Sequence, residues 1–133
     1  MNRRAILSRN IAWATVIFVL CAIPPGTIPA SRGAIPQADK LVHFFLFLVM
    51  SLLLHAATRP LARPRPARAI LLVILCCTAY GGMIEILQAR YLHRGGEWMD
   101  LLADSAGAVA GSLAYLALGR WKRKRPLKGV GKK

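Results

Sequence analysis

The sequence predicts an all-α protein, an integral membrane bundle of four transmembrane helices with cytoplasmic N- and C-termini. Long apolar runs are the first reason, because 56% of the 133 residues are hydrophobic. The placement of charge is the second, because the 19 Lys and Arg and the 5 Asp and Glu are confined to short segments between those runs. A soluble domain of this size scatters both signs over its surface, so the pattern indicates a membrane protein.

Four apolar segments carry this prediction: residues 11–23, 41–58, 69–87 and 101–119. A helix needs about 20 residues to cross a hydrocarbon core of about 30 Å. The last three segments come close to this length, and the first reaches it if residues 5–10 join it with Arg9 directed to the interface. Residues 24–38 and 59–66 are rich in Pro, so we expect loops there that the helices do not continue through.

The first apolar segment has an alternative interpretation as a cleaved signal peptide, because Arg3, Arg4 and Arg9 precede it. A break after Ala30 would place Ile28 at a position that requires a small residue, so we favour a retained helix. Cleavage would leave three spans and would put the two termini on opposite sides of the membrane.

The Lys and Arg residues predict the orientation of the bundle. With four spans, both tails and the link around residues 59–68 share one side and hold fifteen of the nineteen basic residues. The positive-inside rule places that side in the cytoplasm, so we expect a protein of the inner membrane. We expect one transmembrane domain over residues 1–119 and a polybasic cytoplasmic tail over residues 120–133 that attracts anionic lipid.

The composition argues against two other classes of site. The net charge of +14 raises the question of nucleic acid, but the basic residues share no helix face with interleaved aromatics, so we expect no nucleic-acid binding. Cys21, Cys76 and Cys77 lie within apolar runs without the spacing of a zinc site. We interpret them as packing residues, assign no metal ligand from the sequence, and identify no cofactor.

All five acidic residues map to the side opposite most of the bases: Asp39, Glu85, Glu97, Asp100 and Asp104. Asp39 and His43 are four residues apart and share a helix face, as do Glu85 and Gln88 at a separation of three. In the last helix, Asp100 and Asp104 continue as a stripe into Gly107 and Gly111, a GxxxG pair that lets another helix pack closely. The stripe predicts carboxylates held against a neighbouring span.

An ionisable side chain within a span costs a few kcal/mol and requires a partner. Glu85 and Asp104 lie deepest, and Arg94 can fold back from a short Gly-rich loop as a bidentate partner. We predict a polar cluster with Arg94 as its central cation. Its other members are Asp39, Lys40, His43, Glu85, Gln88, Asp100 and Asp104.

The stretches DKLVHFFLF (39–47), EILQ (85–88) and RGGEWMDLLADSAGAVAG (94–111) resemble the signature of the VanZ-like membrane protein family over about residues 36–116. The matching positions are Asp39, Lys40, His43, Phe44, Glu85, Gln88, Arg94, Asp100, Asp104, Gly107 and Gly111. Asp104 departs from the pattern, because the family often has Asn there. The resemblance implies a multi-helix membrane protein whose namesake is associated with low-level teicoplanin resistance, and it implies no established reaction.

Three functions follow from the cluster. In the first, it recognises or modifies a cell-envelope component such as a wall precursor or a glycopeptide-like ligand. In the second, Asp39, His43, Glu85 and Asp100 serve a membrane-embedded enzyme as acid/base groups or as a hard-metal site, although no HExxH or nucleophile motif accompanies them. In the third, the network only neutralises buried charge. Transport is not favoured, because the polar residues beyond the cluster are few and we interpret His55 as an interface residue.

Overall fold

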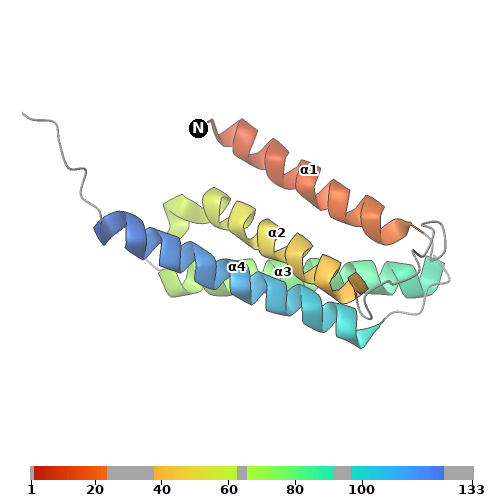
Figure 1. The fold of residues 1–133 in the computed structure, drawn as a ribbon. Coiled ribbons are helices and arrows are strands. Elements are labelled where there is room, and N and C mark those ends of the chain that lie inside the picture. The colour runs from red at the N-terminus through yellow and green to blue at the C-terminus, as the bar shows by residue number, and fades with distance from the viewer. Residues whose placement is uncertain (1, 24–37, 63–65, 92–96, 125–133) are drawn as a thin grey trace, which may run out of the picture.

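Four helices form the bundle in the computed structural model, which describes residues 2–23, 38–62, 66–91 and 97–124. They are α1 (Arg3–Ala22), α2 (Ala38–Ala62), α3 (Pro66–Tyr91) and α4 (Trp98–Lys124). Each is long and apolar enough to cross a membrane, which confirms the expectation of an all-α protein with four candidate spans. Consecutive helices run in opposite directions, so α1 begins at the end of the bundle at which α4 ends (Figure 1).

The helices extend beyond the apolar runs, because flanking polar residues continue the helical hydrogen bonding. α1 begins at Arg3, where the side chain of Asn2 caps it by accepting from the Arg4 N–H. The expected loop over residues 59–66 is wrong at both edges, because α2 runs through Pro60 to Ala62 and α3 begins at Pro66. Pro60 removes a single backbone donor near the helix end, and proline suits the first position of a helix. The rest of this loop and residues 24–37 lie outside the described residues.

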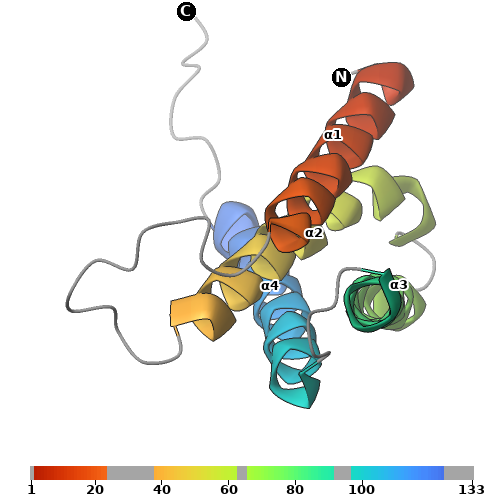
Figure 2. The ribbon, with the colours of Figure 1, turned by 90° about the vertical axis from the view of Figure 1, so that its right-hand side faces the viewer.

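α2 lies between α1 and α4 and packs most extensively against α4 (Figure 2). Two glycines of α4 lie at this contact. A Cβ atom on Gly107 would overlap the carbonyl oxygen of Phe44, and one on Gly111 would lie 2.9 Å from Ser51 Cβ. The two helices therefore approach until backbone touches backbone, a distance that small residues permit.

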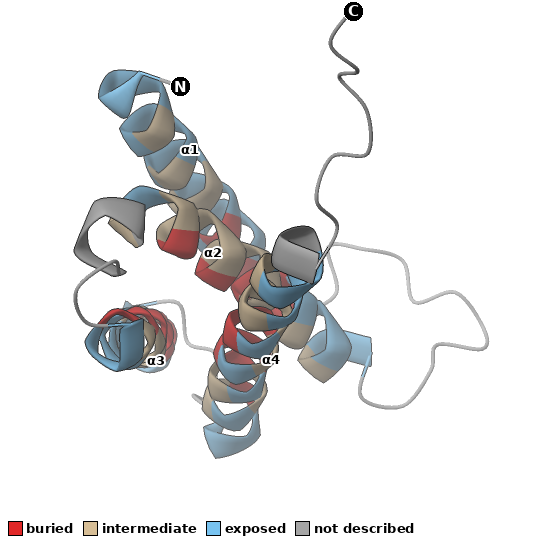
Figure 3. Ribbon diagram, turned by 90° about the vertical axis from the view of Figure 1, so that its left-hand side faces the viewer, coloured by how far each residue is buried: buried red, intermediate tan, exposed pale blue. Residues whose placement is uncertain are grey.

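Buried residues lie on the parts of the helices turned toward the centre of the bundle, and exposed residues lie on its outside (Figure 3). Phe47 and Cys77 are fully buried in the core, whereas Phe45, Leu71 and Leu113 remain more than half exposed. Large apolar side chains on the outside suit a lipid solvent rather than water.

α1 lies at the outside of the bundle, and side-chain contacts to backbone carbonyl oxygens hold it there. The indole of Trp13 donates to the Leu46 carbonyl on α2 over 3.1 Å. The hydroxyl of Tyr80 on α3 donates to the Ala14 carbonyl, and the amide of Gln88 donates to the Cys21 carbonyl, each over 2.7 Å. These three contacts join α1 to α2 and α3.

Candidate functional site

The candidate site lies at the end of the bundle where α1 and α3 end and α2 and α4 begin, which we call the acidic end (Figure 1). Lys40 links two helices there. Its ammonium donates to Glu97 Oε2 over 2.6 Å and to Asp100 Oδ1 over 3.0 Å. Both carboxylates stand at the start of α4, where the helix dipole favours negative charge. Lys40 thereby ties the first turn of α2 to the first turn of α4.

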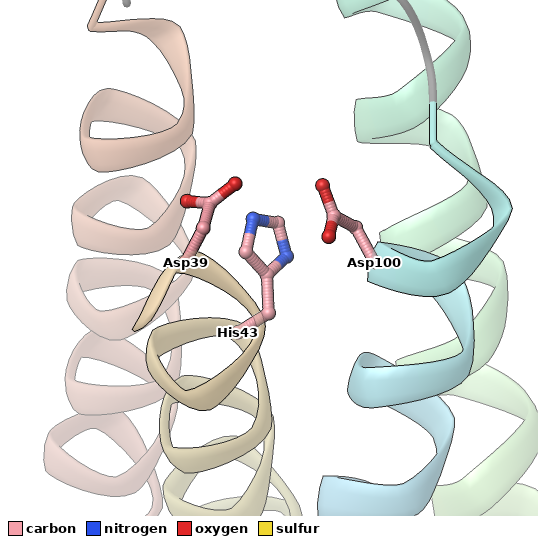
Figure 4. A group of neighbouring side chains, drawn as sticks. All are labelled: Asp39, His43 and Asp100. Atoms are coloured by element: carbon pink, nitrogen blue, oxygen red, sulfur yellow. The ribbon is translucent and has the colours of Figure 1, made fainter. Parts of the chain in front are cut away.

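His43 lies one helical turn inward from Asp39 on α2, between the carboxylates of Asp39 and Asp100 (Figure 4). One donor atom from each of these three residues lies within 4.8 Å of the other two. Asp39 is exposed and Asp100 is buried, so this outer group opens toward the surface of the acidic end.

A second group lies deeper and consists of His43, Glu85 and Asp104, which we call the inner triad. His43 Nδ1 lies 2.9 Å from Asp104 Oδ1, and both side chains are almost fully buried. Glu85 comes from α3, and one donor atom from each member lies within 4.8 Å of the other two. His43 Nε2 lies 4.0 Å from Cys21 Sγ, so all four helices contribute to the surroundings of this imidazole.

The two oxygens of Glu85 differ in their surroundings. Oε2 accepts the backbone N–H of Glu97 over 3.0 Å. Oε1 is buried and has no hydrogen-bond partner among the described residues. A buried carboxylate oxygen without a donor costs free energy, so this atom is the least satisfied acceptor of the site.

Gly81 of α3 makes room for the inner triad. A Cβ atom at this position would overlap Asp104 Oδ2, whereas one on the neighbouring Gly82 would lie 3.9 Å from Leu101 Cδ1. The Asp104 carboxylate therefore packs directly against the backbone of α3, and any side chain at position 81 would displace it.

A groove of about 310 Å³ lies between α3 and α4 beside the inner triad. Its walls combine apolar side chains with two carboxylates: Gly82, Glu85, Ile86, Ala89, Glu97, Trp98 and Leu101. Trp98 is 82% exposed at its rim. The groove therefore joins a surface of lipid-facing side chains to the polar residues of the acidic end.

A separate polar contact lies further along α2 and α4 and involves His55. This side chain is buried between the helices, and its Nε2 lies 2.9 Å from Ser112 Oγ. Its ring stacks on Tyr115 with centroids 4.5 Å apart. Ser51 Oγ lies 3.1 Å from Ser112 Oγ and donates to the Ala108 carbonyl. The hydroxyls and the imidazole satisfy one another, which stabilises this interface.

The structure brings most of the predicted cluster together and changes several roles. Asp39, Lys40, His43, Glu85, Asp100 and Asp104 all lie at the acidic end, as the contacts above describe. Gln88 instead contacts α1 through the Cys21 carbonyl. Arg94, the predicted central cation, lies outside the described residues, and Lys40 is the ammonium that the structure places between carboxylates.

Sequence reasoning missed three contributors to the site. Cys21 contacts the triad imidazole, Gly81 accommodates Asp104, and Glu97 binds Lys40 and Glu85. The signal for Glu97 was present, since it lies three residues before Asp100 at the start of α4. Nothing in the spacing of an apolar helix distinguishes Cys21 or Gly81 from packing residues.

A sequence model of the family described as VanZ/LLP1 matches residues 4–119. The chain belongs to the VanZ/LLP1 family. This confirms the resemblance found in the sequence and extends it from α1 into the last turns of α4. Membership of the VanZ/LLP1 family together with four apolar helices makes the protein a multi-pass membrane protein. No curated protein sequence and no solved structure gives a significant match.

Proposed function

We propose that this VanZ/LLP1 protein recognises an amphiphilic component of the cell envelope, of the wall-precursor or glycopeptide class, at the groove between α3 and α4. The groove itself is the observation that carries the proposal. It offers apolar walls continuous with the lipid-facing surface, and Glu85 and Glu97 at its polar side. Ligand sites typically combine an apolar pocket with a few convergent polar groups. An acyl or prenyl chain fits the walls, and a polar head group fits the carboxylates.

The charge of the acidic end favours one chemistry for that head group. Among the described residues, five carboxylates surround Lys40 and His43: Asp39, Glu85, Glu97, Asp100 and Asp104. Carboxylates accept hydrogen bonds from hydroxyl and ammonium groups. Sugar hydroxyls and peptide amines, which wall precursors and glycopeptides both carry, are therefore the groups that this end would bind.

The orientation of the protein is part of the proposal. Fifteen of the nineteen basic residues belong in sequence to the segments around the starts of α1 and α3 and around or beyond the ends of α2 and α4. The positive-inside rule places these segments in the cytoplasm, and the acidic end then faces the outer side of the inner membrane. Lipid-linked wall precursors are exposed on that side, which supports a role in envelope recognition.

Trp98 tests the proposal, because it lines the groove without belonging to the inner triad. The purified protein in lipid nanodiscs would be titrated with a fluorescent lipid-linked wall precursor and, separately, with fluorescent teicoplanin. We expect saturable binding of at least one probe and a loss of affinity of about tenfold in Trp98→Ala, the size of a well-packed aromatic contact. Trp121→Ala, an exposed aromatic near the other end of α4, is the matched control and should bind normally.

Two results would reject recognition at this groove. One is no saturable binding of either probe by the wild-type protein. The other is equal binding by the Trp98→Ala and Trp121→Ala variants, which would place any bound probe elsewhere.

A further inference from the structure

We propose that His43, Glu85 and Asp104 bind a divalent transition-metal ion, with Zn²⁺ as the best match to the donor set. The proposal goes beyond ligand recognition and does not depend on it. One imidazole nitrogen and two carboxylate oxygens form the donor set, and each comes from a different helix of the trio α2, α3 and α4. Imidazole ligands favour zinc and its neighbours over magnesium and calcium.

The charge balance of the inner triad is the first support. Asp104 is 1% exposed, His43 4% and Glu85 9%, so two carboxylates are removed from water beside one imidazole. Among the described residues, the nearest ammonium, that of Lys40, binds Glu97 and Asp100 instead. In the state that binds a metal, with both carboxylates ionised and the imidazole neutral, the triad carries a charge of −2, which a divalent cation cancels. Buried charges in proteins are generally paired or coordinate a metal.

The unpartnered oxygen of Glu85 is the second support and is independent of the first. Oε1 is buried and has no hydrogen-bond partner among the described residues, although the side chain belongs to a group whose donor atoms converge. The hydrogen bonds described for the site do not involve this oxygen. A bound cation would satisfy it.

The spacing of the donor atoms suits one ion. Atoms bound about 2.1 Å from a zinc ion lie roughly 3.0 to 3.4 Å from one another. His43 Nδ1 and Asp104 Oδ1 are 2.9 Å apart, so this pair is already close to that spacing. All three donors lie within 4.8 Å, so a shift of no more than roughly 2 Å by the flexible Glu85 side chain completes the set.

The other side of the His43 ring fits the role of a ligand. Metal-bound imidazoles usually donate their second N–H to a neighbouring acceptor, which fixes the tautomer. Here Nε2 lies 4.0 Å from Cys21 Sγ, a weak acceptor. When the ion displaces the proton that Nδ1 shares with Asp104, the proton on Nε2 remains and the Nδ1 lone pair faces the ion.

Metal analysis of the purified, tag-free full chain tests this inference. The protein in detergent micelles would be stripped with a chelator, dialysed against buffered Zn²⁺ and analysed for bound zinc. We expect about one ion per chain, and a cobalt-substituted sample should show the visible d–d absorption of a low-symmetry N/O site. Glu85→Gln and Asp104→Asn, which keep side-chain size, should each weaken binding by at least tenfold, the lower range for disturbed metal sites.

The matched control separates the inner triad from the outer group. Asp39→Asn removes a carboxylate that could join His43 and Asp100 but is absent from the triad, so it should leave zinc affinity within about threefold of wild type. The thermal midpoint of each metal-free variant would show that the variant is folded. The midpoint of the wild-type protein should rise with added zinc.

Three results would overturn the inference. The first is substoichiometric zinc in the wild-type protein at saturating concentration. The second is wild-type affinity in folded Glu85→Gln and Asp104→Asn variants. The third is loss of zinc in Asp39→Asn with retention in Glu85→Gln, which would assign the ion to the outer group. Glu85 lines the groove as well as the triad, so recognition is tested at Trp98, which does not belong to the triad. A failure of zinc binding can therefore be told apart from a failure of ligand recognition.

Discussion

His43 Nδ1 lies 2.9 Å from Asp104 Oδ1, and this buried contact joins α2 to α4 between residues 61 positions apart in the chain. The two backbones touch just beyond it at Gly107, so the pair lies next to a close backbone contact between α2 and α4. Replacing only one residue of such a buried polar pair lowers the free energy of unfolding, because the other residue stays buried without a hydrogen-bond partner.

Replacing Asp104 should therefore depend on what replaces it. Asp104→Leu leaves the His43 imidazole buried without its partner and should lower the free energy of unfolding by about 3 kcal/mol. Asp104→Asn retains an oxygen acceptor of the same size and should cost about 1 kcal/mol. Reversible unfolding in mixed micelles, followed by circular dichroism, measures both. Equal losses in the two variants would show that the hydrogen bond contributes nothing.

Gly81 and Gly82 provide a second test at adjacent positions of α3. Gly81→Ala pushes a methyl group into the Asp104 carboxylate, so we expect a loss of about 1 to 2 kcal/mol from overpacking. Gly82→Ala meets only Leu101 Cδ1 at 3.9 Å and should be neutral or gain up to about 1 kcal/mol from helix propensity. The same unfolding measurement distinguishes them. A Gly81→Ala variant as stable as Gly82→Ala would contradict the packing described.

The contact between α2 and α4 predicts a similar contrast along α4. Gly107→Ala would force a methyl group onto the Phe44 carbonyl, which is backbone and cannot rotate away, so we expect a loss of about 2 to 3 kcal/mol. Gly119→Ala meets no heavy atom within 4 Å and should be neutral or gain up to about 1 kcal/mol from helix propensity. If the two variants had the same stability, the close approach of the helices at Gly107 would be wrong.

The orientation of the bundle in the membrane can be measured with one cysteine introduced at a time. The two positions are exposed and lie in the first turn of α3 and the first turn of α4, at opposite ends of the bundle. Trp98→Cys lies at the acidic end and Ala67→Cys at the other end of the bundle. A membrane-impermeant maleimide added to intact spheroplasts should label Trp98→Cys at once, and Ala67→Cys only after permeabilisation. The unmodified chain is the control for its own thiols, of which Cys21 and Cys77 are buried. The reverse pattern would place the acidic end in the cytoplasm.

The four helices could be predicted from the sequence because transfer of long apolar runs into lipid outweighs every local preference. Their ends could not. Hydropathy reports the length in contact with lipid, whereas a helix continues as long as its backbone hydrogen bonds do, and so Arg3 and Pro60 lie within helices. The loss of one donor at Pro60 is too small to end a helix within its last turn.

For the candidate site, the sequence could predict which residues share a helix face but not which residues pair between helices. Helical spacing puts Asp39 beside His43 and gives α4 a stripe of Asp100 and Asp104, because these relations lie within one helix. The partner of each residue depends on how one helix is rotated against the next, and that rotation follows from close packing at glycines. The pairing of His43 with Asp104 and the burial of His55 are relations between helices of this kind.

The dominance of the α2–α4 contact has a consequence for biogenesis. The ribosome delivers α2 to the membrane well before α4, so Lys40 and His43 enter the translocon while Glu97, Asp100 and Asp104 are still unsynthesised. During that interval Lys40 and His43 lack the partners that α4 supplies, so we expect α2 to stay near water or the insertion machinery. A nascent chain that stops before α4 should be a substrate for membrane quality-control proteases rather than a stable three-helix intermediate.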